Sequence, residues 1–149
     1  MKIEALHQLF LNAKGITTDT RSLNQGALFF ALKGENFNGN NFAQNALDSG
    51  VSFCIIDEVQ TTMNERFILV DNVLQTLQDL ANFHRKYLNI PVIALTGSNG
   101  KTTTKELINA VLMQHFKTQA TQGNYNNHIG VPLTLLQMDK TTEIGIVEM

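Results

Sequence analysis

The sequence has one cysteine and no long apolar run, and each scarcity excludes a class of protein. With Cys54 alone, no disulfide can form within the chain and no metal site can be built from thiolates. No segment approaches the roughly 18–20 apolar residues of a membrane span, so no membrane partner is expected. Residues 1–11 contain Glu4 and too short an apolar stretch for a signal peptide, which makes a cytoplasmic location the expectation.

Charged residues are also few and nearly balanced. They make up 16% of the 149 residues, and the net charge is −2. A nucleic-acid binder usually carries a basic stripe, so no nucleic-acid partner is expected. The hydrophobic fraction of 43% predicts a soluble globular protein with a real core, sized for one ordinary domain or one small domain plus part of another.

The first half of the chain predicts an alternation of helices and short strands. Apolar spacing and turn residues predict a helix over 3–11, strands over 27–32, 51–57 and 66–71, a polar loop over 35–41 and a helix over 41–50. This order of strand, helix and strand favours α/β layering over an all-β sandwich.

A long amphipathic helix is predicted over 72–88, where leucines recur every three to four residues. Pro91 stops it, because the residue before a proline is disfavoured in the α conformation. We therefore expect one unit over residues 1–85 and a second over 86–149.

The second unit is predicted to open with a strand, a glycine turn and a helix. Residues 91–97 form a nearly continuous apolar run, the pattern of a strand covered on both faces. Residues 101–116 predict a helix, and residues 143–149 predict another buried strand. The apolar side of that helix is predicted to carry Leu107, Ile108, Val111, Leu112 and Phe116.

The turn "GSNG" (97–100) has the composition of a phosphate-binding loop. Free N–H groups and the positive end of a helix meet at such a turn, and both favour phosphate. Lys101 can reach the β- and γ-phosphates, and Thr102 can offer its hydroxyl to Mg²⁺. The standard pattern holds two more residues between its glycines. A plain turn with a surface lysine is the alternative, but the buried strand before it and the three threonines after Lys101 favour a nucleotide loop.

Two further polar features accompany this loop. Glu148 ends the last predicted strand, at the sheet edge where α/β proteins place ligand-facing groups, so its carboxylate can hold Mg²⁺ beside Thr102. The alternative is simply a polar residue at a strand end. Asn126 and Asn127 crowd a loop before an apolar run, and asparagine amides suit polar substrates and helix caps alike. Both interpretations of these asparagines stay open.

In the first half, small hydroxyls, one arginine and several glycines gather over residues 17–39. Asp19 and Arg21 can pair with each other across a turn. Alternatively, Thr20, Arg21 and the following loop present donors to an anionic or uracil-like ligand. Chemistry alone does not separate these two interpretations.

Four motifs, taken in order, resemble the Mur ligases, the ATP-dependent amide-forming enzymes of peptidoglycan precursor synthesis. They are "TDTRSLNQGALFFALKGENFNGNNFAQNALDSG" (18–50), "ALTGSNGKTTTKELI" (94–108), "GNYNNHIGVPLTLL" (123–136) and "IVEM" (146–149). In that family the short loop is the normal form. The resemblance implies an α/β fold, with a small N-terminal α/β domain of the Mur ligase type followed by the truncated start of a P-loop ATPase α/β domain.

The resemblance points to the branch of the family that joins D-Ala-D-Ala to UDP-MurNAc-tripeptide. It implies ATP and Mg²⁺ as cofactors and a monomer as the expected state. In the implied reaction, ATP phosphorylates the tripeptide carboxylate, and the amine of D-Ala-D-Ala then attacks the acyl phosphate.

The resemblance also implies roles for individual residues. The ATP loop would comprise Gly97, Ser98, Asn99, Gly100, Lys101, Thr102 and Thr103. Lys101 would act catalytically at the transferred phosphate, while Thr102 and Glu148 would hold Mg²⁺. The residues implied in binding the uridine-nucleotide substrate are Thr20, Arg21, Glu35, Asn36, Phe37, Asn126 and Asn127.

Members of the family continue well beyond the terminal "VEM", so we expect this chain alone to be inactive as a ligase and to bind ATP weakly or not at all. One alternative is the sister ligase that adds the third amino acid, against which the motif over 123–136 argues. Folylpolyglutamate synthase shares a similar loop, but the first half of the chain argues against it. The remaining alternative is a non-catalytic module that binds a uridine nucleotide.

Overall fold

The computed structural model describes residues 1–149, which divide into two compact units, Met1–Leu80 and Ala81–Met149. Each unit contains a parallel sheet with helices, which confirms the predicted α/β class. The boundary between the units, after Leu80, lies within helix α3 (Val73–Leu88). The boundary expected from the sequence, between 1–85 and 86–149, lies five residues later in the same helix. No helix of the chain is long and apolar enough to cross a bilayer.

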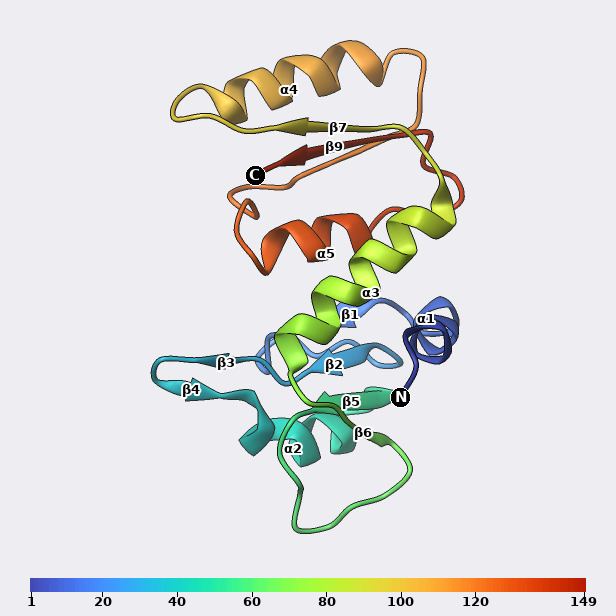
Figure 1. Cartoon of the computed structure of the whole chain (residues 1–149), viewed down its shortest axis with the longest axis vertical. Coiled ribbons are helices and arrows are strands. Elements are labelled where there is room, and N and C mark those ends of the chain that lie inside the picture. Colours follow the sequence, from blue (N-terminus) through green and yellow to red (C-terminus); the bar gives the residue numbers. More distant parts are fainter. The chain divides into compact units, whose positions relative to one another are not determined.

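The first unit is built on a four-stranded parallel sheet with the order β1-β2-β5-β6 (Figure 1). Its strands are β1 (Ile16–Thr17), β2 (Leu28–Phe30), β5 (Phe53–Ile56) and β6 (Phe67–Leu69). The helices of this unit, besides the start of α3, are α1 (Ile3–Asn12), the 3₁₀ turn η1 (Gly39–Phe42) and α2 (Ala43–Asp48). The three longer strands confirm the apolar runs from which they were predicted, and β2 is buried along its whole length, as expected for a central parallel strand.

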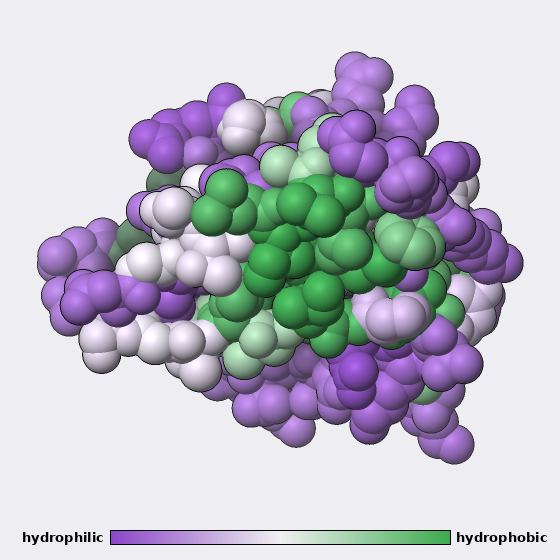
Figure 2. Space-filling view, turned by 90° about the horizontal axis from the view of Figure 1, so that it is seen from above, coloured by the Kyte–Doolittle hydropathy of each residue, from purple (hydrophilic) through white to green (hydrophobic).

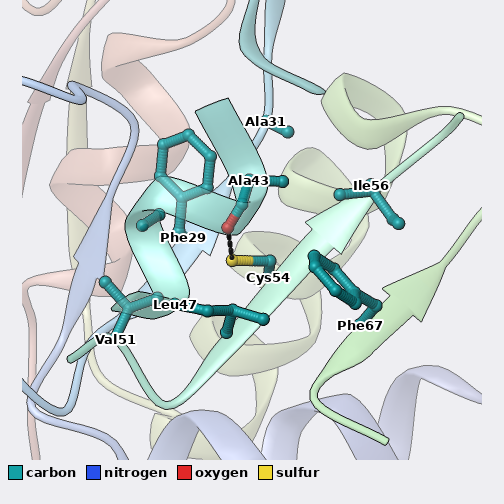
Figure 3. Packing of buried hydrophobic residues seen from close by; sticks show 9 residues of the cluster. Phe29, Ala31, Ala43, Leu47, Val51, Cys54, Ile56 and Phe67 are labelled. Carbon is teal, nitrogen blue, oxygen red and sulfur yellow. Dashed lines mark hydrogen bonds between the residues drawn. The ribbon is translucent and has the colours of Figure 1, made fainter. Parts of the chain in front are cut away.

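The core of this unit lies between α2 and the sheet. Its buried members are Phe29, Ala31, Ala43, Ala46, Leu47, Val51, Cys54, Ile56 and Phe67. Cys54 lies at the centre of the cluster, where its thiol donates to the carbonyl of Ala43 at 3.3 Å (Figure 3). Burial raises the pKa of this thiol to about 12, so Cys54 acts as a small core residue.

The polar loop predicted over 35–41 is wrong in part. A short antiparallel hairpin, β3 (Lys33–Gly34) and β4 (Phe37–Asn38), runs directly into η1. Asn38 starts that turn, because its side-chain oxygen accepts from the backbone N–H of Asn40 at 3.0 Å. The polar asparagines that suggest a loop are therefore the groups that order this segment.

The second unit holds a three-stranded parallel sheet with the order β7-β9-β8. The strands are β7 (Val92–Leu95), β8 (Thr118–Ala120) and β9 (Ile144–Glu148), and the helices are α4 (Lys101–Leu112) and α5 (Gly130–Leu136). Figure 1 shows α4 on one face of this sheet and α5 on the other. The predicted strand–turn–helix and the buried last strand are thus confirmed.

Two burial predictions for this unit are wrong. Ala94 of β7 is exposed and its other residues are only half buried, so this strand is not covered on both faces. On α4, Leu107 and Val111 are 64% and 69% exposed, while Lys105 is fully buried. The side of α4 that carries Leu107 and Val111 therefore faces outward, while Ile108 and Leu112 are half buried, and Figure 2 shows an apolar patch on the outward face. The Lys105 side of the helix faces the sheet, where the lysine donates to the carbonyl of Thr121 at 2.7 Å.

Candidate nucleotide and substrate sites

The turn between β7 and α4 depends on glycine at both ends. Gly97 has a φ of 144° and Gly100 a φ of 75°, values that L-residues with side chains rarely adopt. Gly100 lies directly before α4, and its carbonyl accepts from the N–H of Thr104 at 2.9 Å. Ser98 and Asn99 lie between the glycines, and the whole turn is exposed. The loop therefore opens the N-terminus of a 12-residue helix to a ligand from solvent.

Lys101 is the first residue of α4, and its side chain bends back over the turn. Its Nζ donates to the carbonyl oxygen of Gly97 at 2.6 Å. The charge therefore lies above the loop itself, where it can meet a phosphate held by the turn. Thr103 follows as an exposed residue of the first helical turn.

Thr102 and Glu148, predicted as metal ligands from positions 46 residues apart, meet in the structure. The Thr102 hydroxyl donates to the Glu148 carboxylate at 3.1 Å. The register of the sheet explains this meeting, because Glu148 of β9 pairs with Leu95, the last residue of β7 before the loop. The backbone N–H of Glu148 is fixed in turn by the hydroxyl of Thr121 at 2.9 Å.

The Glu148 carboxylate is buried but stays ionised. The hydrogen bond from Asn126 Nδ2, at 2.9 Å, lowers its pKa most. Burial opposes this shift, while the Thr102 hydroxyl and the charges of Lys105 and Lys101 reinforce it. The result is a carboxylate with a pKa below its usual range at the mouth of the loop.

The donor set suits Mg²⁺ that arrives with a nucleotide. A hydroxyl and a carboxylate are hard oxygen donors, and Mg²⁺ is commonly held by one or two carboxylates together with substrate phosphates. No group of three or more histidines, cysteines or acidic residues in the chain can hold a metal. Thr102 and Glu148 therefore fit a metal shared with phosphates better than a closed protein site.

The two predicted asparagines act differently. Asn126 donates to Glu148, and so lies beside the Thr102–Glu148 contact. Asn127 accepts instead from the backbone N–H groups of Ile129 and Gly130, at 3.0 and 2.8 Å, and thereby caps the start of α5. The structure thus shows one asparagine at the site and the other as a cap, and a substrate role for either stays a prediction.

In the first unit, Arg21 pairs with Asp19. The Arg21 Nε and Nη2 atoms donate to the two Asp19 oxygens at 3.0 and 2.9 Å, and the Arg21 backbone N–H also donates to this carboxylate. These bonds lower the pKa of Asp19 to about 2, the side-chain contact with Arg21 being the main cause. Thr20 lies between them in the turn after β1, at the carboxyl edge of the parallel sheet.

Glu35, Asn36 and Phe37 lie on the β3–β4 hairpin and are all exposed. Phe37 stacks on Phe42, with ring centroids 5.3 Å apart and planes inclined by 11°. The hairpin therefore presents an aromatic face together with polar side chains, a combination that suits a base and its sugar.

A polar clamp, formed by Lys33, Asn38, Asn40, Asp57 and Glu58, fixes the base of the hairpin. Lys33 pairs with Asp57 at 2.9 Å and with Glu58 at 2.8 Å. The asparagines donate to the same two acids, Asn38 to Glu58 and Asn40 to Asp57. Burial tends to raise the pKa of Asp57, but the bonds from Lys33 and Asn40 outweigh it and lower that pKa overall.

Sequence reasoning missed this clamp and also Lys105. A signal for Lys105 was present, because it shares a helical side with Ile108, Asn109 and Leu112 at the three-to-four spacing of a buried stripe. The clamp had no comparable signal, since its acids follow a strand 20 residues after the hairpin.

A glycine loop between a parallel strand and a helix, with a carboxylate at the end of the neighbouring strand, defines a nucleotide-binding α/β protein. Comparison with known families makes the assignment specific. Residues 12–85 match the Mur ligase family, catalytic domain, and residues 95–149 match the Mur ligase middle domain. The chain belongs to the Mur ligase family.

Individual relatives narrow the assignment within the family. The chain is 47% identical over 137 residues to the UDP-N-acetylmuramoyl-tripeptide–D-alanyl-D-alanine ligase of Bacillus subtilis (strain 168). That match covers 91% of this chain and 30% of the relative, so the chain spans about a third or less of the length of this enzyme.

Solved structures give the same result. A MurF crystal structure from Acinetobacter baumannii superposes with a TM-score of 0.88 at 32% identity, covering 99% of this chain and 35% of that one. The MurF ligase from Thermotoga maritima in complex with ADP gives 0.84 at 32% identity, covering 100% of this chain and 33% of that one. A 2,6-diaminopimelate ligase structure, at 20% identity and a TM-score of 0.56, shares the fold alone.

Proposed function

We propose that this chain is the substrate-binding and phosphate-binding part of an ATP-dependent ligase that joins D-Ala-D-Ala to UDP-MurNAc-tripeptide. The contact between Thr102 and Glu148 at the mouth of the loop is the observation that carries the proposal. It brings together the hydroxyl and the carboxylate that a nucleotide-bound Mg²⁺ requires, beside the exposed N-terminus of α4. The Bacillus subtilis relative, a tripeptide–D-alanyl-D-alanine ligase at 47% identity, supplies the substrate.

In this reaction the chain binds and positions the γ-phosphate of ATP. The turn over 97–100 and the start of α4 offer N–H donors to the phosphates, and Lys101 places a full positive charge over them. Thr102 and Glu148 would hold Mg²⁺, which when bound would neutralise charge on the transferred phosphoryl group. Transfer of the γ-phosphoryl group to the tripeptide carboxylate releases ADP and gives an acyl phosphate. The amine of D-Ala-D-Ala then attacks the acyl carbon, which forms the amide and releases inorganic phosphate.

The first unit is proposed to bind the uridine nucleotide. Thr20 and Arg21 lie in one turn at the carboxyl edge of the sheet, and the clamp fixes the hairpin that carries Glu35, Asn36 and Phe37. Arg21 exchanges its exposed contact with Asp19 for a diphosphate oxygen. Such an exchange is inexpensive, since an exposed ion pair contributes only about 0–1 kcal/mol.

A sister ligase that adds the third amino acid is the second candidate in the same class. The likeness to a diaminopimelate ligase supports the fold alone, whereas the Bacillus subtilis relative with 47% identity carries the D-Ala-D-Ala name. A cytoplasmic monomer as the state of the whole enzyme is likewise part of this proposal.

The nucleotide site is tested by titrating the chain with millimolar Mg·ADP and following backbone amide signals by NMR. We expect shifts at residues 97–103 in the wild type and in Lys117→Ala, which removes an exposed lysine of the same unit. Lys101→Ala should lose them, because the charge over the loop is gone. Equal shifts in Lys101→Ala would contradict the proposed role of the loop.

The uridine site is tested by calorimetry with UDP-MurNAc-tripeptide in the absence of ATP. Binding is expected for the wild type and for Arg85→Ala, an exposed arginine of α3, and it should weaken about tenfold in Arg21→Ala through loss of a charge-assisted bond. No binding by the folded wild-type chain would refute the assignment of the first unit. If the chain binds UDP-MurNAc-dipeptide but not UDP-MurNAc-tripeptide, the result would favour the sister ligase.

A further inference from the structure

Lys105 has the least exposed charge of the chain. Its side chain is 1% exposed, although it lies on α4 only three residues after Thr102. A buried ammonium is unfavourable unless each of its hydrogens finds an acceptor. The contacts of Lys105 therefore indicate what holds it in place.

The Lys105 ammonium contacts three oxygens from three parts of the second unit. It donates to the carbonyl of Thr121 at 2.7 Å, lies 3.0 Å from Oε1 of Glu106 and lies 3.8 Å from Oε2 of Glu148. Glu106 is a largely exposed partner on the same helix. The other two oxygens belong to the end of β8 and the end of β9, so the lysine ties α4 to both strands.

Thr121 contacts Glu148 a second time. Its hydroxyl accepts the backbone N–H of Glu148, while its carbonyl accepts from Lys105. Lys105, Thr121 and Glu148 thus form a closed triangle behind the carboxylate that faces Thr102. Lys105 is thus buried behind this carboxylate, whereas the Lys101 ammonium lies at the exposed loop.

We propose that Lys105 is a positioning residue that fixes the Glu148 carboxylate opposite Thr102, so that these two ligands are held ready for nucleotide-bound Mg²⁺. The metal part of this proposal rests on the proposed function, whereas the positioning part rests on the contacts alone. Residues that orient a metal ligand commonly change metal affinity about 10- to 100-fold when they are lost.

The first test is a double-mutant cycle on the unfolding equilibrium of the second unit. Lys105→Met keeps the volume of the side chain but leaves Glu148 without its counter-charge, so it should be strongly destabilising. In the Glu148→Gln background, the factor by which Lys105→Met raises the unfolding constant should be about 10- to 100-fold smaller than in the wild-type background. Equal effects in both backgrounds would show that Lys105 does not act through Glu148.

The cycle remains decisive if Lys105→Met does not fold. The double variant replaces both buried charges by neutral groups of similar size and is expected to fold. A double variant that also fails to fold would overturn the proposal, because Lys105 would then be needed by the fold and not by Glu148.

A spectroscopic signature separates positioning from simple stabilisation. The side-chain amide of Asn126 donates to Glu148, so its NMR signals report where that carboxylate lies. They should shift in folded Lys105→Met and stay unchanged in Glu106→Gln, which removes only the exposed partner of the lysine. Unchanged Asn126 signals in Lys105→Met would overturn the proposal.

The last measurement uses Mn²⁺ with ADP as a paramagnetic probe of the metal site. Broadening at Thr102 and Glu148 should require about 10-fold more Mn²⁺·ADP in Lys105→Met than in Glu106→Gln. An unchanged requirement would overturn the metal part of the proposal. If the wild type itself shows no broadening at millimolar Mn²⁺·ADP, this chain by itself does not hold a nucleotide-bound metal, while the cycle and the Asn126 signals still decide whether Lys105 positions Glu148.

Discussion

The variant Gly100→Ala tests whether the loop before α4 requires a glycine with a left-handed backbone conformation. Gly100 has a φ of 75°, and no heavy atom lies within 4 Å of the position that a Cβ would take. The new methyl group therefore meets no neighbour, and the only penalty is the left-handed backbone of an L-residue, about 1–2 kcal/mol. This penalty raises the unfolding constant of the second unit by about 5- to 30-fold. Gly100→Asn is the matched control, since asparagine tolerates this conformation better than alanine.

The chain supplies a probe that reports on the second unit alone. It has no tryptophan, and both of its tyrosines, Tyr87 and Tyr125, fall within residues 81–149. Urea unfolding followed by tyrosine fluorescence therefore measures the stability of this unit. If the free energy of unfolding of Gly100→Ala equals that of the wild type, or if Gly100→Asn is as unstable as Gly100→Ala, the left-handed backbone at Gly100 is not what limits this position.

Three further predictions concern the first unit. Because the contact with Arg21 holds the pKa of Asp19 at about 2, below its ordinary 3.8, the pair stabilises the fold above about pH 4 and ceases to do so as the pH falls to about 2. Arg21→Ala should return the midpoint of the Asp19 carboxyl signal, measured by carbon NMR, toward 3.8, and an unmoved midpoint would contradict the assignment. Cys54, buried and with its pKa raised to about 12, should react with a thiol reagent only after denaturation, so rapid labelling of the native chain would argue against the observed core. Gly39→Ala would put a methyl group 2.7 Å from backbone atoms and should lower the free energy of unfolding by about 1–3 kcal/mol, measured by circular dichroism. Gly34→Ala meets nothing within 4 Å and should change it by less than about 0.5 kcal/mol, so a similar loss in both variants would count against the packing argument.

The sequence predicts the elements that have a clear period or a strong boundary. Helix α3 has leucines at helical spacing and a proline after its end, and β9 is an uninterrupted apolar run. The nucleotide loop was predictable because its glycines, its lysine and its threonine are adjacent in sequence. The meeting of Thr102 with Glu148 also followed, since the carboxyl ends of neighbouring parallel strands lie at one edge of a sheet.

The features that were missed depend on contacts distant in sequence. Strands β1 and β8 have two and three residues, too few to show a period, and they exist because a longer strand pairs with them. The orientation of α4 was predicted wrongly because apolar spacing shows which residues share a side, not which side faces the sheet. On this helix Lys105 is buried and bonded to Thr121, while Leu107 and Val111 are exposed.

The bend of Lys101 onto its own loop has a consequence for affinity. Its ammonium already holds the carbonyl oxygen of Gly97, so an incoming phosphate competes with an acceptor inside the protein. A hydrogen bond of this kind contributes about 0.5–1.5 kcal/mol, and breaking it lowers the apparent affinity for phosphate about 2- to 10-fold. The same bond keeps the lysine near the loop before a ligand arrives, which reduces the side-chain entropy lost on binding. The contact between Lys101 and Gly97 thus lowers the affinity of the loop for phosphate but keeps the lysine in place before binding. A nucleotide whose phosphate competes poorly with the Gly97 carbonyl for this lysine dissociates faster.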